Sequence, residues 1–225
     1  IKVEGYLATG IYNLGHNNTT NVSGIITTEG NDGDGIYNKG DNNTTNVSGN
    51  IKTEGTGALG IYNDFADTNT TTLSGRITTT GDYAHGIVNY GDNNTTNVSG
   101  IITTEGNDGD GIYNKGDNNT TNVSGNIKSE GDAAHGIFNY GDNNTTNVSG
   151  SITTEGDAAH GIVNYGDNNT TTISGTVKAT GASSAALYNR FGDGNSFTLN
   201  EGAIIIGDIL ADDDATSSKL IFNLG

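Results

Sequence analysis

The sequence predicts an all-β fold, a right-handed parallel β-helix (solenoid) with three short strands per rung of about 25 residues and about eight to nine rungs. A Gly-Ile-Tyr-Asn block recurs along the chain, and two further blocks recur between its successive copies. The composition, with 36 glycines, no proline and 31% hydrophobic residues, does not favour a broad globular core. At intervals of 25 or 26 residues, the first block begins at Gly10, Gly35, Gly60, Gly86, Gly111, Gly136 and Gly161, and more loosely at Ala186.

The three recurring blocks are predicted to be the three strands of a rung. The first block is Gly10 to Asn13, the second is Val22 to Gly24, and the third runs from Ile26 to Gly30. Each is rich in Ile, Val, Thr or Tyr, is bounded by Gly, Asn and Asp, and is too short for a helix. Because three such strands cannot bury a face alone, successive units should stack in register, with like strands paired in parallel about 4.8 Å apart. The crossover rule for parallel strands predicts a right-handed coil.

Alternation along each strand assigns side chains to the inside or the outside of the coil. With the aliphatic residues inward, Ile11, Val22 and Ile26 begin three apolar columns. Thr20 and Thr28 begin columns of inward hydroxyls. Asn13 also points inward, and we expect its column to form a ladder of stacked amides that bond along the axis. That structural ladder consists of Asn13, Asn38, Asn63, Asn89, Asn114, Asn139, Asn164 and Asn189.

Two outward columns form a candidate binding face. On the second strand, Thr, Asn and Ser alternate outward, and on the first strand an aromatic stripe points outward. A hydroxyl array could bind a partner or order water and the aromatic stripe could stack on sugar rings, whereas both could equally be ladders that only stabilise the stack. The threonines are Thr19, Thr44, Thr70, Thr95, Thr120, Thr145 and Thr170. The tyrosines are Tyr12, Tyr37, Tyr62, Tyr113 and Tyr188, with Val88, Phe138 and Val163 in the same column.

We expect residues 1–225 to form a single solenoid fragment, with regular repeats over 1–186 and divergent C-terminal rungs over 187–225. The segment Ala203 to Ile206 is more apolar than any earlier segment. The chain has no Met and starts within a repeat, so it is expected to be a piece of a longer protein whose anchor or translocator lies elsewhere.

Composition also narrows the range of functions that the chain could have. A net charge of −17 with only nine Lys and Arg argues against nucleic-acid binding. The absence of cysteine excludes disulfides and thiolate chemistry, and no apolar run approaches the length that membrane insertion of this segment would need. Asp, Glu and His recur in equivalent settings rather than in one singular constellation, so we do not expect an enzyme.

Two groups of residues could hold a metal ion, although no cofactor is required. Asp32, Asp34, Asp108 and Asp110 lie in Asn-Asp-Gly-Asp-Gly segments that locally resemble calcium-binding glycine-aspartate repeats. Because the period of those repeats is nine residues and the period here is 25, solvated turn acids are favoured, and weak calcium sites are the alternative. His85, His135 and His160 precede the head glycines, where such residues are expected to fill a corner of the coil. His135 and His160 should be direct neighbours, and a metal pair there is the alternative.

The repeat as a whole resembles the passenger domains of bacterial autotransporters and related large β-helical adhesins. The resemblance rests on the Gly-Ile-Tyr-Asn heads, the Asn-Asn-Thr-Thr-Asn-Val-Ser-Gly segments, the Ala-His-Gly-Ile runs at Ala84, Ala134 and Ala159, and the C-terminal segment from Glu201. It implies export through a translocating barrel and display outside the cell on a bacterial surface. It also implies adhesion or autoaggregation, with another copy or a host glycan or protein receptor as partner.

The functional expectation is therefore a surface-exposed structural or adhesive stalk that mediates cell-surface adhesion or autoaggregation through its repeated Thr, Asn, Ser and Tyr ladders. One alternative is a unit of a structural fibre or sheath stacked end to end. A second is an ice-binding solenoid, although Asn between the outward Thr and Ser interrupts a clean hydroxyl face.

Overall fold

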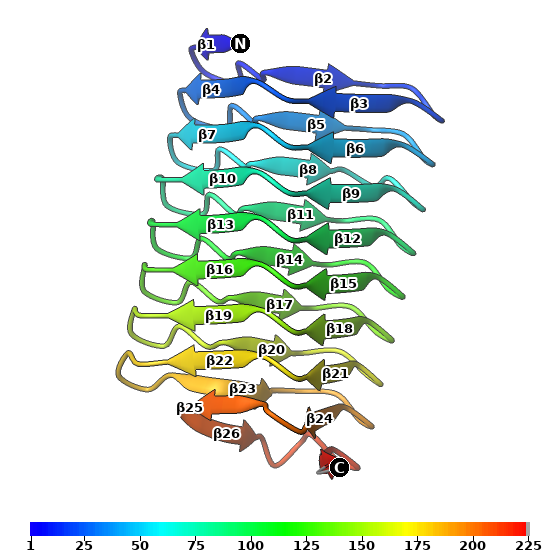
Figure 1. The fold of residues 1–225 in the computed structure, drawn as a ribbon, viewed down its shortest axis with the longest axis vertical. Helices are drawn as coiled ribbons and strands as arrows, with labels where there is room; N and C mark the ends of the chain where they lie inside the picture. The colour runs from blue at the N-terminus through cyan, green and yellow to red at the C-terminus, as the bar shows by residue number, and fades with distance from the viewer. Residues whose placement is uncertain (224–225) are drawn as a thin grey trace.

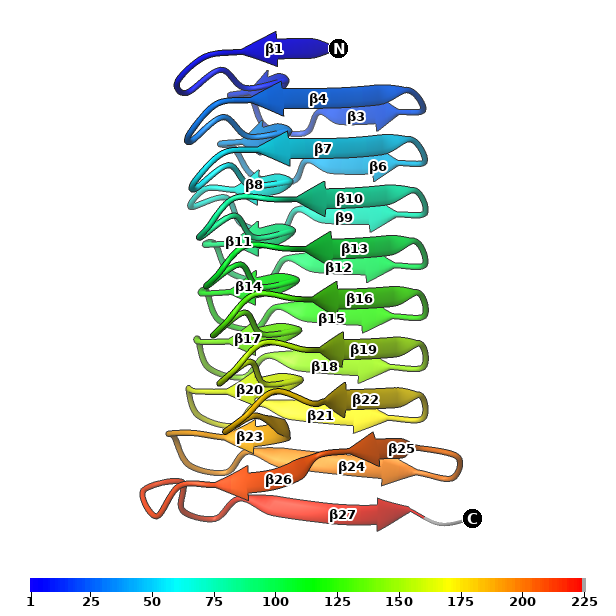
Figure 2. The ribbon, with the colours of Figure 1, turned by 90° about the vertical axis from the view of Figure 1, so that its left-hand side faces the viewer.

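The computed structural model describes residues 1–223, and within that span it contains 27 strands and no helix. The strands form three parallel nine-stranded sheets, which are the three sides of one coil (Figures 1 and 2). In Figure 1 the chain passes behind the coil along β2, returns in front along β3 and β4, and descends one rung, which is a right-handed path. The predicted fold class is confirmed. None of the described residues forms a helix that could cross a membrane.

Sheet A contains the third strand of each rung. Its register joins equivalent residues, as Ile77 pairs with Ile51 on one side and with Ile102 on the other. These isoleucines are buried. The outward side chains include Lys128, whose Nζ lies 2.7 Å from Glu130 Oε1. The strands are β1 (Lys2–Glu4), β4 (Ile25–Glu29), β7 (Asn50–Glu54), β10 (Arg76–Thr79), β13 (Ile101–Thr104), β16 (Asn126–Ser129), β19 (Ser151–Thr154), β22 (Thr176–Ala179) and β25 (Ile204–Ile206).

Sheet B contains the Ile-x-Asn strands that follow the head glycines. Its register is regular until β23 and β26, where it shifts between Ala185 and Leu187 in the divergent rungs. The strands are β2 (Ile11–Asn13), β5 (Ile36–Asn38), β8 (Ile61–Asn63), β11 (Ile87–Asn89), β14 (Ile112–Asn114), β17 (Ile137–Asn139), β20 (Ile162–Asn164), β23 (Ala185–Asn189) and β26 (Asp208–Ala211).

Sheet C contains the Thr-rich strands, again in register, so that Thr95 pairs with Thr70 and Thr120. The strands are β3 (Thr19–Val22), β6 (Thr44–Val47), β9 (Thr70–Leu73), β12 (Thr95–Val98), β15 (Thr120–Val123), β18 (Thr145–Val148), β21 (Thr170–Ile173), β24 (Ser196–Asn200) and β27 (Lys219–Asn223).

The core is a narrow apolar column enclosed by the three sheets. Each regular rung contributes one aliphatic residue from every sheet, for example Ile112, Val123 and Ile127, all of which are buried. Aliphatic burial alone is therefore small per rung, and the parallel backbone ladders and internal polar ladders must contribute to holding the rungs together.

The asparagine column of sheet B lies inside the coil and forms a continuous ladder. Asn89 Nδ2 donates to Asn114 Oδ1 at 2.9 Å, and Asn114 Nδ2 donates to Asn139 Oδ1 at 2.9 Å. Asn114 Nδ2 also donates to Thr121 Oγ1 at 3.1 Å, which joins the amide ladder to the inward threonines of sheet C. The same amide bonding runs from Asn13 to Asn189.

A second internal asparagine ladder, which the sequence analysis did not identify, lies in the turn before sheet C. The backbone N–H of Asn94 donates to Asn119 Oδ1 at 2.7 Å, and that of Asn119 donates to Asn144 Oδ1 at 2.7 Å. The residue before each of these asparagines has a positive φ, as at Asn93 (58°) and Asn118 (57°). This left-handed residue turns the next side chain into the coil, where its oxygen satisfies a buried backbone donor.

Candidate functional site

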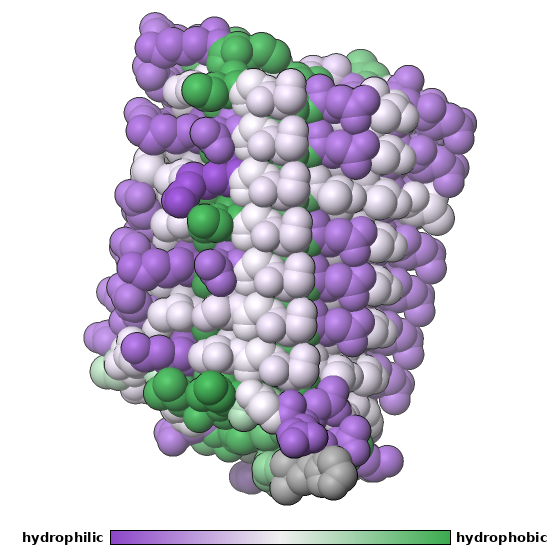
Figure 3. All heavy atoms as spheres, in the orientation of Figure 1, coloured by the Kyte–Doolittle hydropathy of each residue, from purple (hydrophilic) through white to green (hydrophobic). Residues whose placement is uncertain are grey.

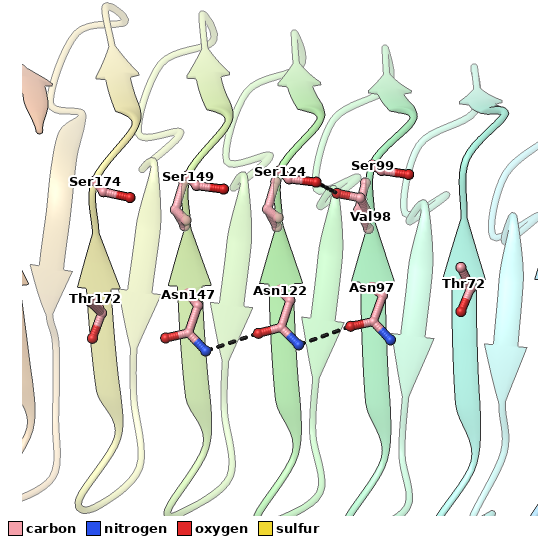
Figure 4. Close-up of a pocket in the computed structure, with 12 residues that line it drawn as sticks. Thr72, Asn97, Val98, Ser99, Asn122, Ser124, Asn147, Ser149, Thr172 and Ser174 are labelled. Atoms are coloured by element: carbon pink, nitrogen blue, oxygen red, sulfur yellow. Dashed lines mark hydrogen bonds between the residues drawn. The ribbon is translucent and has the colours of Figure 1, made fainter. Parts of the chain in front are cut away.

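The outward face of sheet C, which we call the polar face, is a repeated array of uncharged hydrogen-bonding groups. Its three columns are the Thr19, Asn21 and Ser23 positions of each rung, and they run in parallel along the axis in Figure 3. On β12, β15 and β18 the outward amides form a ladder of their own (Figure 4). Asn122 Nδ2 donates to Asn97 Oδ1 at 2.9 Å, and Asn147 Nδ2 donates to Asn122 Oδ1 at 2.9 Å.

A shallow groove of about 320 Å³ runs along the polar face between its asparagine and serine columns. Its floor is formed by Val98, Val123 and Val148, and the amide ladder forms one wall. Thr72 and Thr172 replace asparagine at the two ends of this stretch. Asn122 and Asn147 each donate one of their two amide N–H groups along the ladder, so the second N–H of each is free to bind a partner or water.

The outward tyrosines of sheet B form the base of an aromatic ridge rather than an open stripe. Only Tyr12, on the first complete rung, is highly exposed, at 57%. Tyr37 is half-buried, and its ring stacks on Tyr12 with centroids 4.6 Å apart. Farther along the ridge, Tyr113 stacks on Phe138 at 5.4 Å. The half-buried members also include Tyr62 and Tyr188.

The rest of the ridge comes from residues that the sequence analysis did not single out. Tyr90 and Tyr165 lie two positions beyond Val88 and Val163, which are buried although they point away from the core. Tyr140 stacks on Tyr165 with centroids 4.8 Å apart. The signal is present in the sequence, because the rungs that begin at Ile87, Ile137 and Ile162 read Ile-Val-Asn-Tyr or Ile-Phe-Asn-Tyr, with a tyrosine after the strand asparagine, whereas the other rungs have their tyrosine directly before that asparagine. In these three rungs a tyrosine lies two positions later in the sequence, but its ring still lies in the ridge.

His85, His135 and His160 lie in one column at the corner before sheet B, which we call the histidine corner. Each ring accepts the backbone N–H of the residue one rung later at its Nδ1 atom. The donors are Asp110 to His85 at 2.9 Å, His160 to His135 at 3.0 Å and Ala185 to His160 at 2.9 Å. His135 and His160 stack with centroids 5.1 Å apart. Because Nδ1 accepts a hydrogen bond, the neutral ring has its proton on Nε2.

Burial keeps these imidazoles neutral. It lowers the pKa of His85 to about 4 and that of His135 to about 3, and it also lowers the pKa of His160. His85 Nδ1 lies 3.5 Å from Asp110 Oδ2. We do not assign an ion pair there, since the same nitrogen already accepts the backbone N–H of Asp110 and the neutral ring has no charge to offer.

The four calcium candidates lie as two pairs in different rungs. Asp34 and Asp110 are buried, at 6% and 4% exposure, whereas Asp32 and Asp108 are left-handed turn residues with φ of 54°. Asp34 Oδ1 accepts the Leu59 N–H at 2.9 Å, and Asp110 Oδ1 accepts the His135 N–H at 2.7 Å. Residues 1–223 contain no group of three or more His, Asp or Glu side chains placed to hold a metal ion. Calcium binding at these turns stays a prediction.

The acidic turn column that includes Asp92 and Asp117 has a structural role. Each carboxylate accepts the backbone N–H of the equivalent residue one rung later, as Asp117 N–H donates to Asp92 Oδ1 and Asp142 N–H to Asp117 Oδ1, both at 2.8 Å. Similar bonds join Asp132 to Asp157 in the turn before the histidine corner. Acidic side chains therefore replace backbone carbonyls as acceptors where the chain leaves the sheets.

We expect Asp34→Asn to stabilise the protein, and by more at pH 7 than at pH 4. Burial raises the pKa of Asp34 from 3.8 to about 7. Below pH 3.8 the Asp34 carboxyl is protonated in both the folded and the unfolded state. Between pH 3.8 and about 7 it ionises only in the unfolded chain, so the free energy of unfolding falls by about 1.4 kcal/mol per pH unit. Above pH 7 the loss is constant. Asparagine keeps the Oδ1 acceptor for the Leu59 N–H without the buried charge.

Denaturant unfolding of both proteins between pH 4 and pH 8 measures this difference. Asp32→Asn, in the same turn but exposed, is the control and should change the free energy of unfolding little at any pH. A gain from Asp34→Asn that does not vary with pH would contradict the assignment of a buried, protonated carboxyl.

Comparison of the chain with protein-family models, curated proteins and solved structures finds no match. The polar face, the aromatic ridge and the histidine corner are the three surface features that could carry a function.

Proposed function

We propose that this chain is a non-enzymatic, surface-exposed bacterial stalk, like an autotransporter passenger in role, that mediates adhesion or autoaggregation through its polar face. The observation that supports the proposal most is the neutrality of this face. The molecule has a net charge of −17, yet every outward position of sheet C from Thr19 to Asn200 is Thr, Asn or Ser. Two acidic copies meet the least repulsion where these uncharged faces approach each other.

The chemistry of the polar face also suits self-association. Hydroxyls and amides both donate and accept, so a second copy of the same face is a complementary partner without any change of sequence. The same set of groups returns about every 4.8 Å along the axis. Each contact is weak, but many rungs engage together, so avidity makes the sum strong. A host glycan with repeated hydroxyls would be bound by the same groups.

Placing charge on the polar face should abolish association. The triple variant Asn97→Lys, Asn122→Lys and Asn147→Lys breaks the amide ladder and sets three ammonium groups against the three in the opposing copy. Beads coated with the native chain should clump, and beads coated with the variant should stay dispersed, as measured by light scattering.

The matched control carries the same three charges on sheet A. Thr27→Lys, Thr103→Lys and Thr153→Lys use a column in which Lys52, Lys128 and Lys178 already occur, so the fold tolerates them. Its beads should clump like the native ones. Equal loss of clumping in both triple variants, or no clumping of the native chain, would contradict the proposal. Inhibition of ice growth by dispersed native protein would favour the ice-binding alternative.

A further inference from the structure

Two adjoining hollows lie beside the histidine corner, on a different side of the coil from the polar face. Each has a volume of about 310 Å³, and Ala133, His135 and Arg190 line both. The C-terminal hollow is completed by Ala158, Ser183, His160, Tyr188 and Leu210. The N-terminal hollow is completed by Tyr83, His85, Asp108, Asp110, Tyr113 and Phe138. Together they form one groove along the axis.

The groove exists because three successive turns have small side chains. Ala133, Ala158 and Ser183 share the left-handed turn position, with φ of 53°, 53° and 55°. The same position has larger side chains in other rungs, including Tyr83 with φ of 56°. Replacement of a large side chain by a small one over three rungs opens the floor without changing the backbone.

The walls of the groove combine ring faces with hydrogen-bond donors. His160 packs against Tyr188 with centroids 4.8 Å apart, and His135 packs against Phe138 at 5.3 Å. Because the Nδ1 atoms accept backbone N–H groups, the neutral rings present Nε2–H as donors. Aromatic faces beside directed donors are the chemistry that binds the apolar face and the hydroxyls of a sugar ring.

Arg190 adds a positive charge at the junction of the two hollows. It is one of only two arginines in an acidic chain, and its side chain is exposed, with Cζ 5.7 Å from the Phe191 ring. A guanidinium presents a planar fork of donors that matches a carboxylate. The N-terminal hollow instead contains Asp108, whose carboxylate disfavours an anionic ligand at that end.

We infer that this groove binds a linear glycan, with a carboxylated sugar ring beside Arg190 in the C-terminal hollow and an uncharged sugar ring in the N-terminal hollow. This site is separate from the polar face, and the inference goes beyond the proposed adhesion: self-association requires no groove, and the groove requires no second copy.

Isothermal titration with a hyaluronan tetrasaccharide, in which glucuronate alternates with a neutral hexosamine, tests the inference. The native chain should bind it, and should bind its carboxyl-reduced counterpart at least about tenfold more weakly, the loss expected for one charge-assisted pair. Arg190→Gln should weaken binding of the carboxylated tetrasaccharide by about the same factor. Ala158→Tyr should abolish binding, because Tyr83 shows that this turn position accepts tyrosine while its ring would fill the floor.

Two control variants make the same changes away from the groove. Arg76→Gln removes the other arginine, on sheet A, and Leu7→Tyr places tyrosine at the same turn position in the first rung. Both should bind like the native chain, and thermal unfolding checks that all four variants fold. Equal binding of the two tetrasaccharides, equal loss in Arg76→Gln and Arg190→Gln, or no binding by the native chain would overturn the inference. Bead clumping by the polar face is unaffected by any of these results.

Discussion

Gly125→Ala should lower the free energy of unfolding by about 3 kcal/mol or more, although it adds only one methyl group. A Cβ at Gly125 would lie 2.0 Å from the carbonyl oxygen of Gly100 in the preceding rung. Relief of this clash requires the two rungs to separate, but the Gly125 N–H donates to the Val98 carbonyl at 3.0 Å and the Asn126 N–H donates to Gly100 at 3.0 Å. The methyl group therefore cannot fit unless hydrogen bonds of the backbone ladder lengthen or break.

Gly24→Ala is the matched control for this prediction. Gly24 occupies the same column in the first rung, where an added Cβ meets nothing within 4 Å. The variant should unfold within about 1 kcal/mol of the native chain, since alanine also reduces the entropy of the unfolded state. Urea unfolding of both variants measures the contrast, and similar losses in the two would show that stacking is not the cause.

Asn114→Leu should destabilise the protein by about 3 kcal/mol or more. The substitution nearly preserves volume but removes both ladder bonds and the bond to Thr121. Asn139 Oδ1 then loses its ladder donor in a buried site, which costs the desolvation of an unpaired acceptor. The apolar surface gained does not offset that loss.

Asn122→Leu, in the outward ladder of the polar face, is the comparison. It also breaks two amide bonds, with Asn97 and Asn147, but these side chains can bond to water instead. A loss below about 1 kcal/mol is expected. If the two variants proved equally destabilised in denaturant unfolding, burial of the inner ladder would not be the source of its contribution.

The sequence predicts the strands well because their side chains alternate strictly. Once Ile11 is placed inward, Asn13 must also point inward and Tyr12 outward, and the 25-residue period carries that assignment to every rung. The 26-residue unit has one extra residue within Asp64 to Asp67, between its first and second blocks, and this segment forms the turn between β8 and β9.

Turns were harder to predict because alternation does not hold there. A left-handed residue such as Asn93 turns the chain so that Asn94 points inward, which produced the second asparagine ladder that strand reasoning missed. The aromatic ridge was missed for a related reason. Tyr90 lies just beyond its strand, so its cover over Val88 depends on how the turn folds back on the outer face.

The residues of the candidate sites were predictable in part. The polar face and the ladders follow from period and alternation, whereas the groove at the histidine corner depends on which turns have Ala or Ser and on where one arginine side chain lies. Such a singular arrangement has no period, and it is visible only once the rungs are stacked.

Spin-label distances between rungs test the stacking of equivalent residues most directly. The chain has no cysteine, so pairs of cysteines can be introduced on the outward face of sheet A at Thr27 with Thr103, Thr153 or Lys178. In-register rungs predict separations of about 14, 24 and 29 Å, because these pairs lie three, five and six rungs apart at about 4.8 Å each. Distances that do not rise by this constant increment would contradict the stacked coil on which both binding proposals depend.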